Sequence, residues 1–368
     1  MNYQPNQLVI EKEKIKHNLK EIQNLVGKNI TVIPVIKNNA YQVGVAELLS
    51  ILKEEKVKMV GVATVFEAIN LRKLGYTEEI LVLLQPCIEQ IDDIVEYDIV
   101  SNVSSLSFVE KLNQKALKKE KFMKIHIEIE TGMGRTGIKK EEISSFLKKI
   151  KTMKHINIEG VSTHFSCACS DENYTKKQKN YFQQVLTIWE KEEKLPKWIH
   201  ASSSGAILNE KDAYFNSVRP GLMLYGYLPE RKQNKKIDLK PAVFLRTQIT
   251  HLQELKKGEA IGYDKAVILN RDSKIAVIPI GYADFLLPLQ NRTGQVVIKN
   301  KKANILTACM DVMMVDATEI EEAEIGDEVF LWDNDMVTLE DWTKWTGLDK
   351  HHILSSLSNR IERKVRHK

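Results

Sequence analysis

The stretch ITVIPVIK, at residues 30–37, is the first of eight short apolar runs that decide the fold. Each run is almost continuously hydrophobic, which is typical of strands buried on both faces of a parallel sheet. Longer amphipathic, lysine-rich stretches follow most of them, and FEAINLRKLG (66–75), for example, ends on Gly75 as a helix does. Such strand–helix units over residues 12–230 predict an α/β fold, an N-terminal (β/α)8 TIM barrel. The other seven runs are KMVGVAT (58–64), EILVLLQ (79–85), DIVSNV (98–103), FMKIHIEIE (122–130), INIEGVSTHF (156–165), KWIHASS (197–203) and NSVRPGL (216–222).

The pattern changes after about residue 230. RKQNKKIDLK (231–240) is a polar, charged connection, and beyond it the helical period is mostly lost. Strand candidates such as KIAVIPIGY and DEVFLW crowd together, separated by turn residues that include Gly258 and Gly294. Residues 236–368 are therefore predicted to form a C-terminal, mostly antiparallel β domain.

Composition excludes several classes of protein. Of the 368 residues, 43% are hydrophobic and 28% charged, which indicates a globular chain and not a disordered one. Lys and Arg exceed Asp and Glu by 54 − 49 = 5, an excess too small and too dispersed to predict a nucleic-acid partner. No apolar run approaches the roughly 20 residues of a membrane span, and the N-terminus lacks the apolar core of a signal peptide. With four cysteines the chain has no disulfide framework, so we expect a cytoplasmic protein.

Active sites of barrels lie at the C-terminal ends of the strands, and the first run ends on Lys37. A lysine desolvated at the mouth of a barrel has a lowered pKa and a nucleophilic amine, as a Schiff base with a carbonyl cofactor requires. Taken alone, however, Lys37 is more often explained as a strand-capping lysine whose amine reaches solvent.

The fifth run leads into TGMGRTG (131–137), which contains the pattern G-x-G-x-x-G, with Glu159 further on. A Rossmann dinucleotide site is the competing interpretation. Two features count against it. The motif lies in the fifth strand–helix unit and not in the first, and Arg135 would place a cation in a turn that normally needs only backbone N–H groups.

Two further strand ends carry polar residues. HFSCAC (164–169) offers ligand types that suit zinc, but the spacing is short and no second cluster pairs with it, so no metal is expected. SVRPGL (217–222) bares backbone N–H groups next to Arg219, and the serines at 202–204 add hydroxyl donors. The C-terminal end of this eighth apolar run is therefore a candidate phosphate site.

Together and in this order, the motifs resemble those of the fold-type III alanine racemases, which use pyridoxal 5′-phosphate (PLP). The family combines a (β/α)8 barrel with a β domain that the first residues join, so the resemblance implies that residues 1–11 belong with 236–368. The motifs that carry it are VIKNNAYQVG, GMGRTGI, STHFS, HASSSGAIL, VRPGLMLYG, AIGYDKAV, IPIGYADF and TACMDVMMVD.

The resemblance implies a role for each motif. Lys37 would hold PLP through a Schiff base and would act as one base, and Tyr263 from the other subunit of a homodimer would be the second base on the opposite face. Arg219 would donate to the pyridine nitrogen, which would stay unprotonated because arginine does not readily release a proton. His164 would bind Arg219. The remaining assignments are Tyr41, Ser204, Gly221 and Leu222 at the phosphate, Arg135 and the Met310 backbone at the substrate carboxylate, and Tyr282 and Asp311 in support.

The chain departs from the family pattern at four places. It reads Gln-Val at residues 42–43 where Gly-His is usual, and serines at 202–204 replace an Asn-Ser. Glu128 takes the place of a lysine that many members carry in carbamylated form, and would orient Arg135 without a carbamate. Counting back from LSNRIER (357–363), His351 stands where a phosphate-touching tyrosine that narrows the pocket is expected.

The resemblance implies an alanine racemase that interconverts L- and D-alanine by two-base proton transfer and supplies D-alanine for peptidoglycan. A serine or broad-specificity amino-acid racemase on the same scaffold is the alternative, because His351 would leave a roomier pocket. A PLP-binding regulatory protein without turnover is a third interpretation, against which the second domain with Tyr263 counts. An NAD-dependent dehydrogenase is a distant fourth.

Overall fold

The computed structural model describes residues 3–229, 237–285 and 294–366. The chain divides into two compact units, each described here by itself. The barrel unit comprises Lys16–Ala40 and Leu48–Lys240, and the β unit comprises Met1–Ile15, Tyr41–Glu47 and Pro241–Lys368. Most of the connection predicted at 231–240 lies outside the described residues, and so do residues 230 and 236, where the domain boundaries are predicted.

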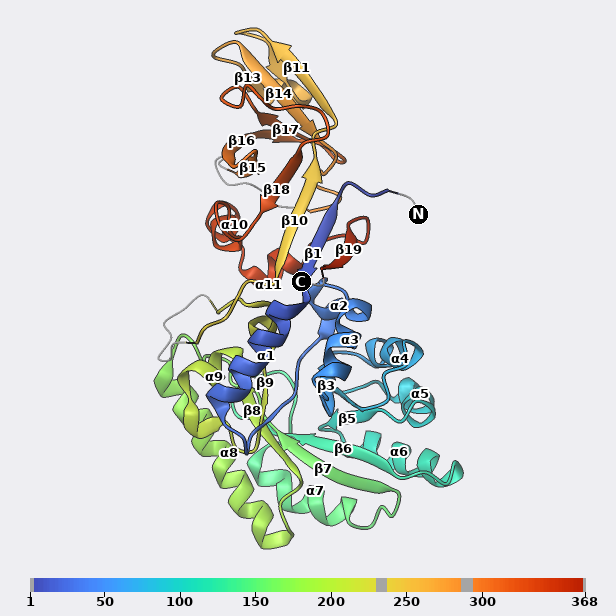
Figure 1. Cartoon of the computed structure of the whole chain (residues 1–368). Coiled ribbons are helices and arrows are strands. Elements are labelled where there is room, and N and C mark those ends of the chain that lie inside the picture. Colours follow the sequence, from blue (N-terminus) through green and yellow to red (C-terminus); the bar gives the residue numbers. More distant parts are fainter. Residues whose placement is uncertain (1–2, 230–236, 286–293, 367–368) are drawn as a thin grey trace. The chain divides into compact units, whose positions relative to one another are not determined.

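The barrel unit contains an eight-stranded parallel sheet, which confirms the fold predicted from the apolar runs (Figure 1). The strands follow the order β2-β9-β8-β7-β6-β5-β4-β3. The sheet closes because Val35 forms a parallel bridge to Gly61 of β3, and the Gly61 N–H donates to the Pro34 carbonyl at 2.8 Å. The strands are β2 (Thr31–Val32), β3 (Met59–Val62), β4 (Glu79–Val82), β5 (Val100–Val103), β6 (Met123–Glu128), β7 (Ile156–Ser162), β8 (Trp198–Ser203) and β9 (Ser217–Arg219).

Helices follow most of these strands. The helix predicted at 66–75 is α4 (Val65–Lys73), which begins with a capping box between Thr64 and Glu67. The last strand is followed only by a 3-10 turn, η4 (Leu222–Tyr225). No helix among the described residues is long and apolar enough to span a membrane. The other helices of this part of the chain are α1 (Lys12–Val26), α2 (Lys37–Tyr41), α3 (Val45–Glu54), α5 (Ile91–Glu96), α6 (Leu106–Lys118), α7 (Ile143–Ile150), α8 (Glu172–Glu192) and α9 (Ser204–Asn209), with the 3-10 turns η1 (Ile88–Gln90), η2 (Lys140–Glu142) and η3 (Lys211–Ala213).

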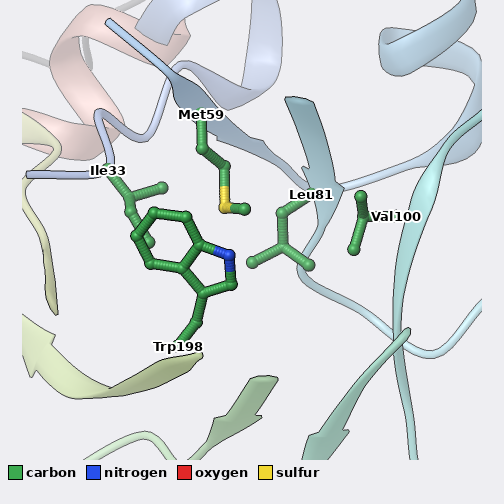
Figure 2. Close-up of a cluster of buried hydrophobic side chains, with 5 residues drawn as sticks. All are labelled: Ile33, Met59, Leu81, Val100 and Trp198. Carbon is green, nitrogen blue, oxygen red and sulfur yellow. The ribbon is translucent and has the colours of Figure 1, made fainter. Parts of the chain in front are cut away.

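One end of the barrel is filled by apolar side chains (Figure 2). Met59, Val100 and Trp198 are the first residues of β3, β5 and β8, and they pack with Ile33 and Leu81 into one buried cluster. Because this cluster occupies the N-terminal ends of the strands, polar groups have room at the opposite, C-terminal ends.

The β unit contains a nine-stranded sheet in the order β11-β14-β17-β16-β15-β18-β10-β1-β19. Its pairs are antiparallel, as predicted, except that β1 pairs in parallel with β19. The sequence did not predict two short helices, α10 (Leu339–Thr346) and α11 (Lys350–Ser355), each of which begins at a capping residue, Thr338 or Asp349. The strands are β1 (Gln7–Glu11), β10 (Val243–Gln248), β11 (His251–Leu255), β14 (Ser273–Ile278), β15 (Gln295–Ile298), β16 (Lys301–Ala308), β17 (Met313–Asp316), β18 (Glu328–Trp332) and β19 (Glu362–Arg366), with a separate pair, β12 (Ala260–Ile261) and β13 (Val267–Ile268), and the 3-10 turn η5 (Tyr263–Lys265).

Candidate active site

Lys37 is followed by a left-handed turn made of non-glycine residues. The φ angles of the five residues Asn38 to Gln42 are 53°, 50°, 58°, 59° and 61°. Each such residue costs roughly 1–2 kcal/mol, and strain of this kind persists only where the surrounding structure holds it. Asn38 and Asn39 are of a type that adopts left-handed angles more readily than most residues, whereas Ala40, Tyr41 and Gln42 give no such signal, and the sequence interpretation did not predict the turn.

Glu67 holds the start of this turn. Its Oε1 accepts the Asn38 N–H at 2.5 Å, while its Oε2 accepts the N–H groups of Ala63 and Thr64 at 2.7 and 3.0 Å.

Desolvation by the surrounding protein and then the charge of Arg135 lower the pKa of Lys37, and the Glu67 carboxylate opposes them. The Lys37 amine is therefore shifted toward its neutral, nucleophilic form.

Arg219 is the last residue of β9 and is only 6% exposed. Its Nη2 donates to the carbonyls of Thr163 and Ala201 at 2.8 and 3.1 Å and lies 3.3 Å from His164 Nδ1. Its Nη1 lies 2.5 Å from His200 Nδ1. These four partners are carbonyl or imidazole groups and not carboxylates, so the hydrogen bonds leave the positive charge of the guanidinium in place at the C-terminal end of the barrel.

A third histidine, His126, extends this network through His200. Arginine can only donate, so His200 Nδ1 accepts from Arg219, and His200 Nε2 therefore carries the proton that binds His126 Nδ1 at 2.8 Å. Burial, followed by the charge of Arg219, lowers the pKa of His126 to about 3 and that of His200 well below its usual value. Both rings stay neutral, whereas Arg219, whose pKa burial lowers to about 10, stays charged. The sequence interpretation missed both histidines, although His200 begins the motif HASSS.

His164 lies among the same charges. Desolvation first, and then the charges of Arg219, Arg135 and Lys37, lower the pKa of His164 to about 3. The structure therefore brings three predicted site residues, Lys37, Arg135 and Arg219, within electrostatic range of a fourth, His164.

Ser204 and Gly221 meet beside Arg219. Ser204 begins α9, and its Oγ accepts the Gly221 N–H at 3.1 Å. Gly221 and Leu222 lie at the start of η4. A serine hydroxyl with neighbouring backbone N–H groups is a donor set that suits a phosphate, although the Gly221 N–H is directed to Ser204 in this structure.

Glu128 holds the predicted carboxylate-binding arginine. It ends β6, is 4% exposed, and its Oε1 lies 3.3 Å from Arg135 Nη2. Its Oε2 accepts the Thr136 hydroxyl at 2.6 Å. Burial raises the pKa of Glu128, and the bonds from Thr136 and Arg135 oppose that rise. One side of the Arg135 guanidinium is thus oriented by a buried carboxyl group.

In the β unit, two loops carry predicted site residues and are joined by their backbones. The N–H groups of Tyr282 and Ala283 donate to the carbonyls of Cys309 and Met310 at 3.1 and 3.0 Å. A Cβ on Gly281 would lie 2.4 Å from each of those carbonyl oxygens, so only glycine allows this approach.

Arg360, a residue that the sequence interpretation did not single out, ties the same loops together. Its Nε lies 3.0 Å from Oδ1 of Asp284, whose side chain is fully buried, and its Nη1 donates to Asp311 Oδ1 at 2.7 Å. Asp284 Oδ2 also accepts the Gly281 N–H at 3.1 Å. Arg360, which belongs to the LSNRIER segment, thus contacts both the loop that bears Tyr282 and the loop that bears Met310.

Tyr263 and Met310 point outward from the β unit. Tyr263, in η5, is 74% exposed, and Met310 is 53% exposed. Both side chains are large and hydrophobic, and the described part of the β unit leaves more than half of the surface of each exposed.

Two of the departures from the family pattern lie beside Tyr41. The Tyr41 and His351 ring centroids are 5.8 Å apart, and burial raises the pKa of Tyr41 to about 12. Arg363 donates from Nε to the Gln42 carbonyl at 3.0 Å and from Nη2 to its side-chain oxygen at 3.4 Å. Gln42 therefore gains a side-chain bond at a positive φ angle, where a glycine would be strain-free.

Within residues 3–229, 237–285 and 294–366, no group of three or more His, Cys, Asp or Glu side chains could hold a metal ion. His164 lies 3.3 Å from Arg219 Nη2, and Cys167 and Cys169 are not joined in a disulfide.

Comparisons with known proteins cover both units. Residues 10–229 match the family described as alanine racemase, N-terminal domain, and residues 242–365 match alanine racemase, C-terminal domain. Alanine racemase 2 of Caldanaerobacter subterraneus subsp. tengcongensis is 34% identical over 98% of this chain and 94% of its own length. Alanine racemase of Halothermothrix orenii is 34% identical over 99% and 97%.

Solved structures agree with these relatives. The alanine racemase of Clostridium difficile superposes with a TM-score of 0.94 at 31% identity, covering 98% of this chain and 95% of that one. That of Bartonella henselae, solved with covalently bound pyridoxal phosphate, has a TM-score of 0.87 at 26% identity and covers 99% and 100%. Since both domain families and nearly the whole length match, the chain belongs to the alanine racemase family.

Proposed function

We propose that this chain is an isomerase that interconverts L-alanine and D-alanine with PLP, using Lys37 and Tyr263 as its two bases. The family assigns the reaction. The observation that carries the assignment to residues is the cluster at the barrel's C-terminal end. There, the Lys37 amine, whose pKa is lowered, and Arg219, which bonds to neutral acceptors, both lie within electrostatic range of His164.

The residues present fit PLP. The Lys37 amine would bind its aldehyde carbon, Arg219 would donate to its pyridine nitrogen, and Ser204 with the backbone at Gly221 and Leu222 would bind its phosphate, assisted by Tyr41. When bound, PLP withdraws electrons from the substrate's α-carbon and so makes the α-proton acidic. The Bartonella henselae relative with covalently bound pyridoxal phosphate supports this cofactor.

The chain's own residues then move the proton and hold the substrate. The Lys37 amine takes or returns the α-proton on one face, and the Tyr263 hydroxyl does so on the other. His164 stays neutral beside Arg219 and leaves the arginine's charge in place. Arg135, oriented by Glu128, and the Met310 N–H bind the substrate carboxylate.

The active form that we propose is a homodimer with shared active sites, in which Tyr263 and Met310 serve the Lys37 of the other subunit. The exposure of Tyr263, 74%, supports this arrangement because a catalytic tyrosine needs a protected surrounding for proton transfer. The proposed setting is the cytoplasm, where D-alanine would be supplied for peptidoglycan. Alanine is the proposed main substrate, and His351 is the residue that would admit serine as a minor one.

A chiral assay across alanine, serine and lysine, combined with borohydride reduction and peptide mapping, tests the proposal. We expect alanine to be racemised fastest and the pyridoxyl mass to be found on Lys37. Lys37→Ala should abolish both results, while Lys58→Ala, at a lysine whose side chain is 69% exposed, should change neither. A pyridoxyl group on another lysine, or no racemisation of alanine by the wild-type protein, would contradict it.

A further inference from the structure

The loop of residues 130–137 presents Arg135 and is closed at its base by the backbone. The Glu130 N–H donates to the Ile138 carbonyl at 3.1 Å. Gly137 has a φ angle of +134°, and a Cβ there would lie 2.3 Å from the Glu130 backbone nitrogen. The two ends of the loop therefore approach each other more closely than any side chain at 137 would permit.

The interior of this loop is filled by the Glu130 carboxylate. The Gly132 N–H donates to its Oε1, and the N–H groups of Gly134 and Arg135 donate to its Oε2 at 2.9 and 3.2 Å. Successive N–H groups that converge on one point form an anion-binding nest. The glycine-rich loop thus already contains its anion, which is why the pattern G-x-G-x-x-G does not serve as a dinucleotide phosphate site in this chain.

The charge state of Glu130 agrees with this geometry. Partial burial by itself raises the pKa of Glu130, but the N–H groups of Gly132, Gly134, Arg135 and Met133 outweigh it and bring the pKa below its usual value. The carboxylate is therefore ionised at neutral pH and accepts strong hydrogen bonds.

We propose that Glu130 is a positioning residue for the substrate, because its carboxylate fixes the backbone of the loop that presents Arg135. The inference rests on the proposed function, in which Arg135 binds the substrate carboxylate. Glu128 and Glu130 then act on different parts of the same arginine, since Glu128 orients the Arg135 guanidinium and Glu130 holds the Arg135 backbone. The loop tip is exposed, so side-chain packing alone does not hold it.

The first test measures amide hydrogen exchange in peptides that cover residues 130–138 of the PLP-loaded full chain. Glu130→Ala empties the nest, so exchange there should accelerate about tenfold or more, since several charge-assisted hydrogen bonds are lost. Acetate replaces the carboxylate and the one carbon that this truncation removes. It should restore protection in Glu130→Ala, whereas sodium chloride at equal ionic strength should not.

The second test is kinetic. Glu130→Ala should raise the KM for alanine about tenfold with a smaller change in kcat, because substrate binding is loosened more than proton transfer. Acetate should lower the ratio of the Glu130→Ala KM to the wild-type KM. Both values are measured in the same acetate buffer, because the wild-type value then corrects for competition by acetate at the substrate site. Glu141→Ala is the matched control, since Glu141 is an exposed carboxylate nearby and its loss removes the same charge.

Each outcome decides the matter. Unchanged exchange in Glu130→Ala, or faster exchange with an unchanged KM, would overturn the positioning role. If the wild-type chain fails to racemise alanine while acetate still restores protection, the proposed function fails and the nest remains. Should Glu130→Ala not fold, Glu130→Gln keeps the size of the side chain and loses its charge. Exchange in this variant should be faster than in the wild-type protein, but less so than expected for Glu130→Ala, because one side-chain oxygen still accepts hydrogen bonds. Acetate should not restore protection because the glutamine still occupies the nest, and wild-type exchange in this variant would also overturn the role.

Discussion

Arg219 and its neighbour His200 are buried and hydrogen-bonded within the barrel unit, whereas Tyr263 and Met310 of the β unit are exposed. In the barrel unit, Arg219 is 6% exposed and bonded to four neighbours, and His200 behind it is fully buried. In the β unit, Tyr263 is 74% exposed and Met310 is 53% exposed. The barrel's groups are therefore held in place by their own unit, whereas those of the β unit are presented outward.

The difference follows from the two architectures. Parallel strands that close into a barrel bring the residues at their C-terminal ends onto one small area, where they can bond to each other. Antiparallel strands end at loops, and here Arg360 and the Gly281 turn hold the loops together without covering the side chains that they present. Outward groups of this kind suit a site that a second subunit completes.

The largest effect should come from separating the two bases. Lys37→Ala and Tyr263→Phe should each lower kcat about a thousandfold or more, as the loss of an acid–base group does. In an equimolar mixture of the two variants, one of the two sites in each hybrid dimer keeps both bases, so activity should recover to about a quarter of the wild-type value if subunits pair at random. No recovery despite demonstrated subunit exchange would show that the sites are not shared.

Acid should destabilise the barrel unit through its buried histidines. The pKa values of His126 and His164 are lowered to about 3, and that of His200 is lowered as well, chiefly by burial. Below about pH 6.5 the unfolded chain binds protons that the folded chain does not, so the free energy of unfolding should fall toward pH 3. The slope should approach about 1.4 kcal/mol per pH unit for each histidine, and Glu128, whose pKa is raised, opposes it.

Urea unfolding at pH 7 and pH 5 checks this expectation. His126→Asn removes one titrating ring, so its unfolding free energy should depend less on pH by about one proton. An equal pH dependence in the variant and the wild-type protein would show that His126 is not held neutral.

Arg360 tests whether the β unit positions its outward groups. Arg360→Met leaves the buried Asp284 carboxylate without the cation that contacts it, so the KM for alanine should rise about tenfold through movement of the Met310 loop. Asp311→Asn weakens only the solvent-exposed contact to Arg360, so it should raise the KM less than Arg360→Met does. Steady-state kinetics of both variants and of the wild-type protein give the comparison, and equal KM values in all three would contradict the positioning role.

A smaller effect is expected at Glu128. Glu128→Gln keeps the shape but weakens the bond to Arg135, so the KM for alanine should rise about fivefold. Activity should not respond to added bicarbonate, because no carbamate is needed. Thr136→Val removes the other bond to Glu128 and leaves the Arg135 contact, which makes it the matched control. Kinetics unaltered by Glu128→Gln would rule out this role.

The smallest effect concerns His351, which lies against Tyr41. Wild-type protein should prefer alanine and turn over serine detectably, since a small increase in pocket size changes binding by only about 1–3 kcal/mol. His351→Tyr should raise the ratio of kcat/KM for alanine to that for serine by about fivefold, which corresponds to the lower end of this range. An unchanged ratio would mean that His351 does not line the pocket.

The sequence by itself determined the barrel, the β domain and the family, because buried parallel strands must be continuously apolar and because the motifs around Lys37, Arg135 and Arg219 are contiguous in the chain. Only the tertiary structure decided how these motifs are held. His126 and His200 lie 74 residues apart and meet because β6 and β8 both face the barrel interior. Three other features likewise depend on φ angles and long-range contacts. They are the left-handed turn after Lys37, the backbone N–H groups around the Glu130 carboxylate, and the ion pairs of Arg360. Residue type alone does not encode them, because an asparagine, a glutamate or an arginine has many possible partners until the fold places one beside it.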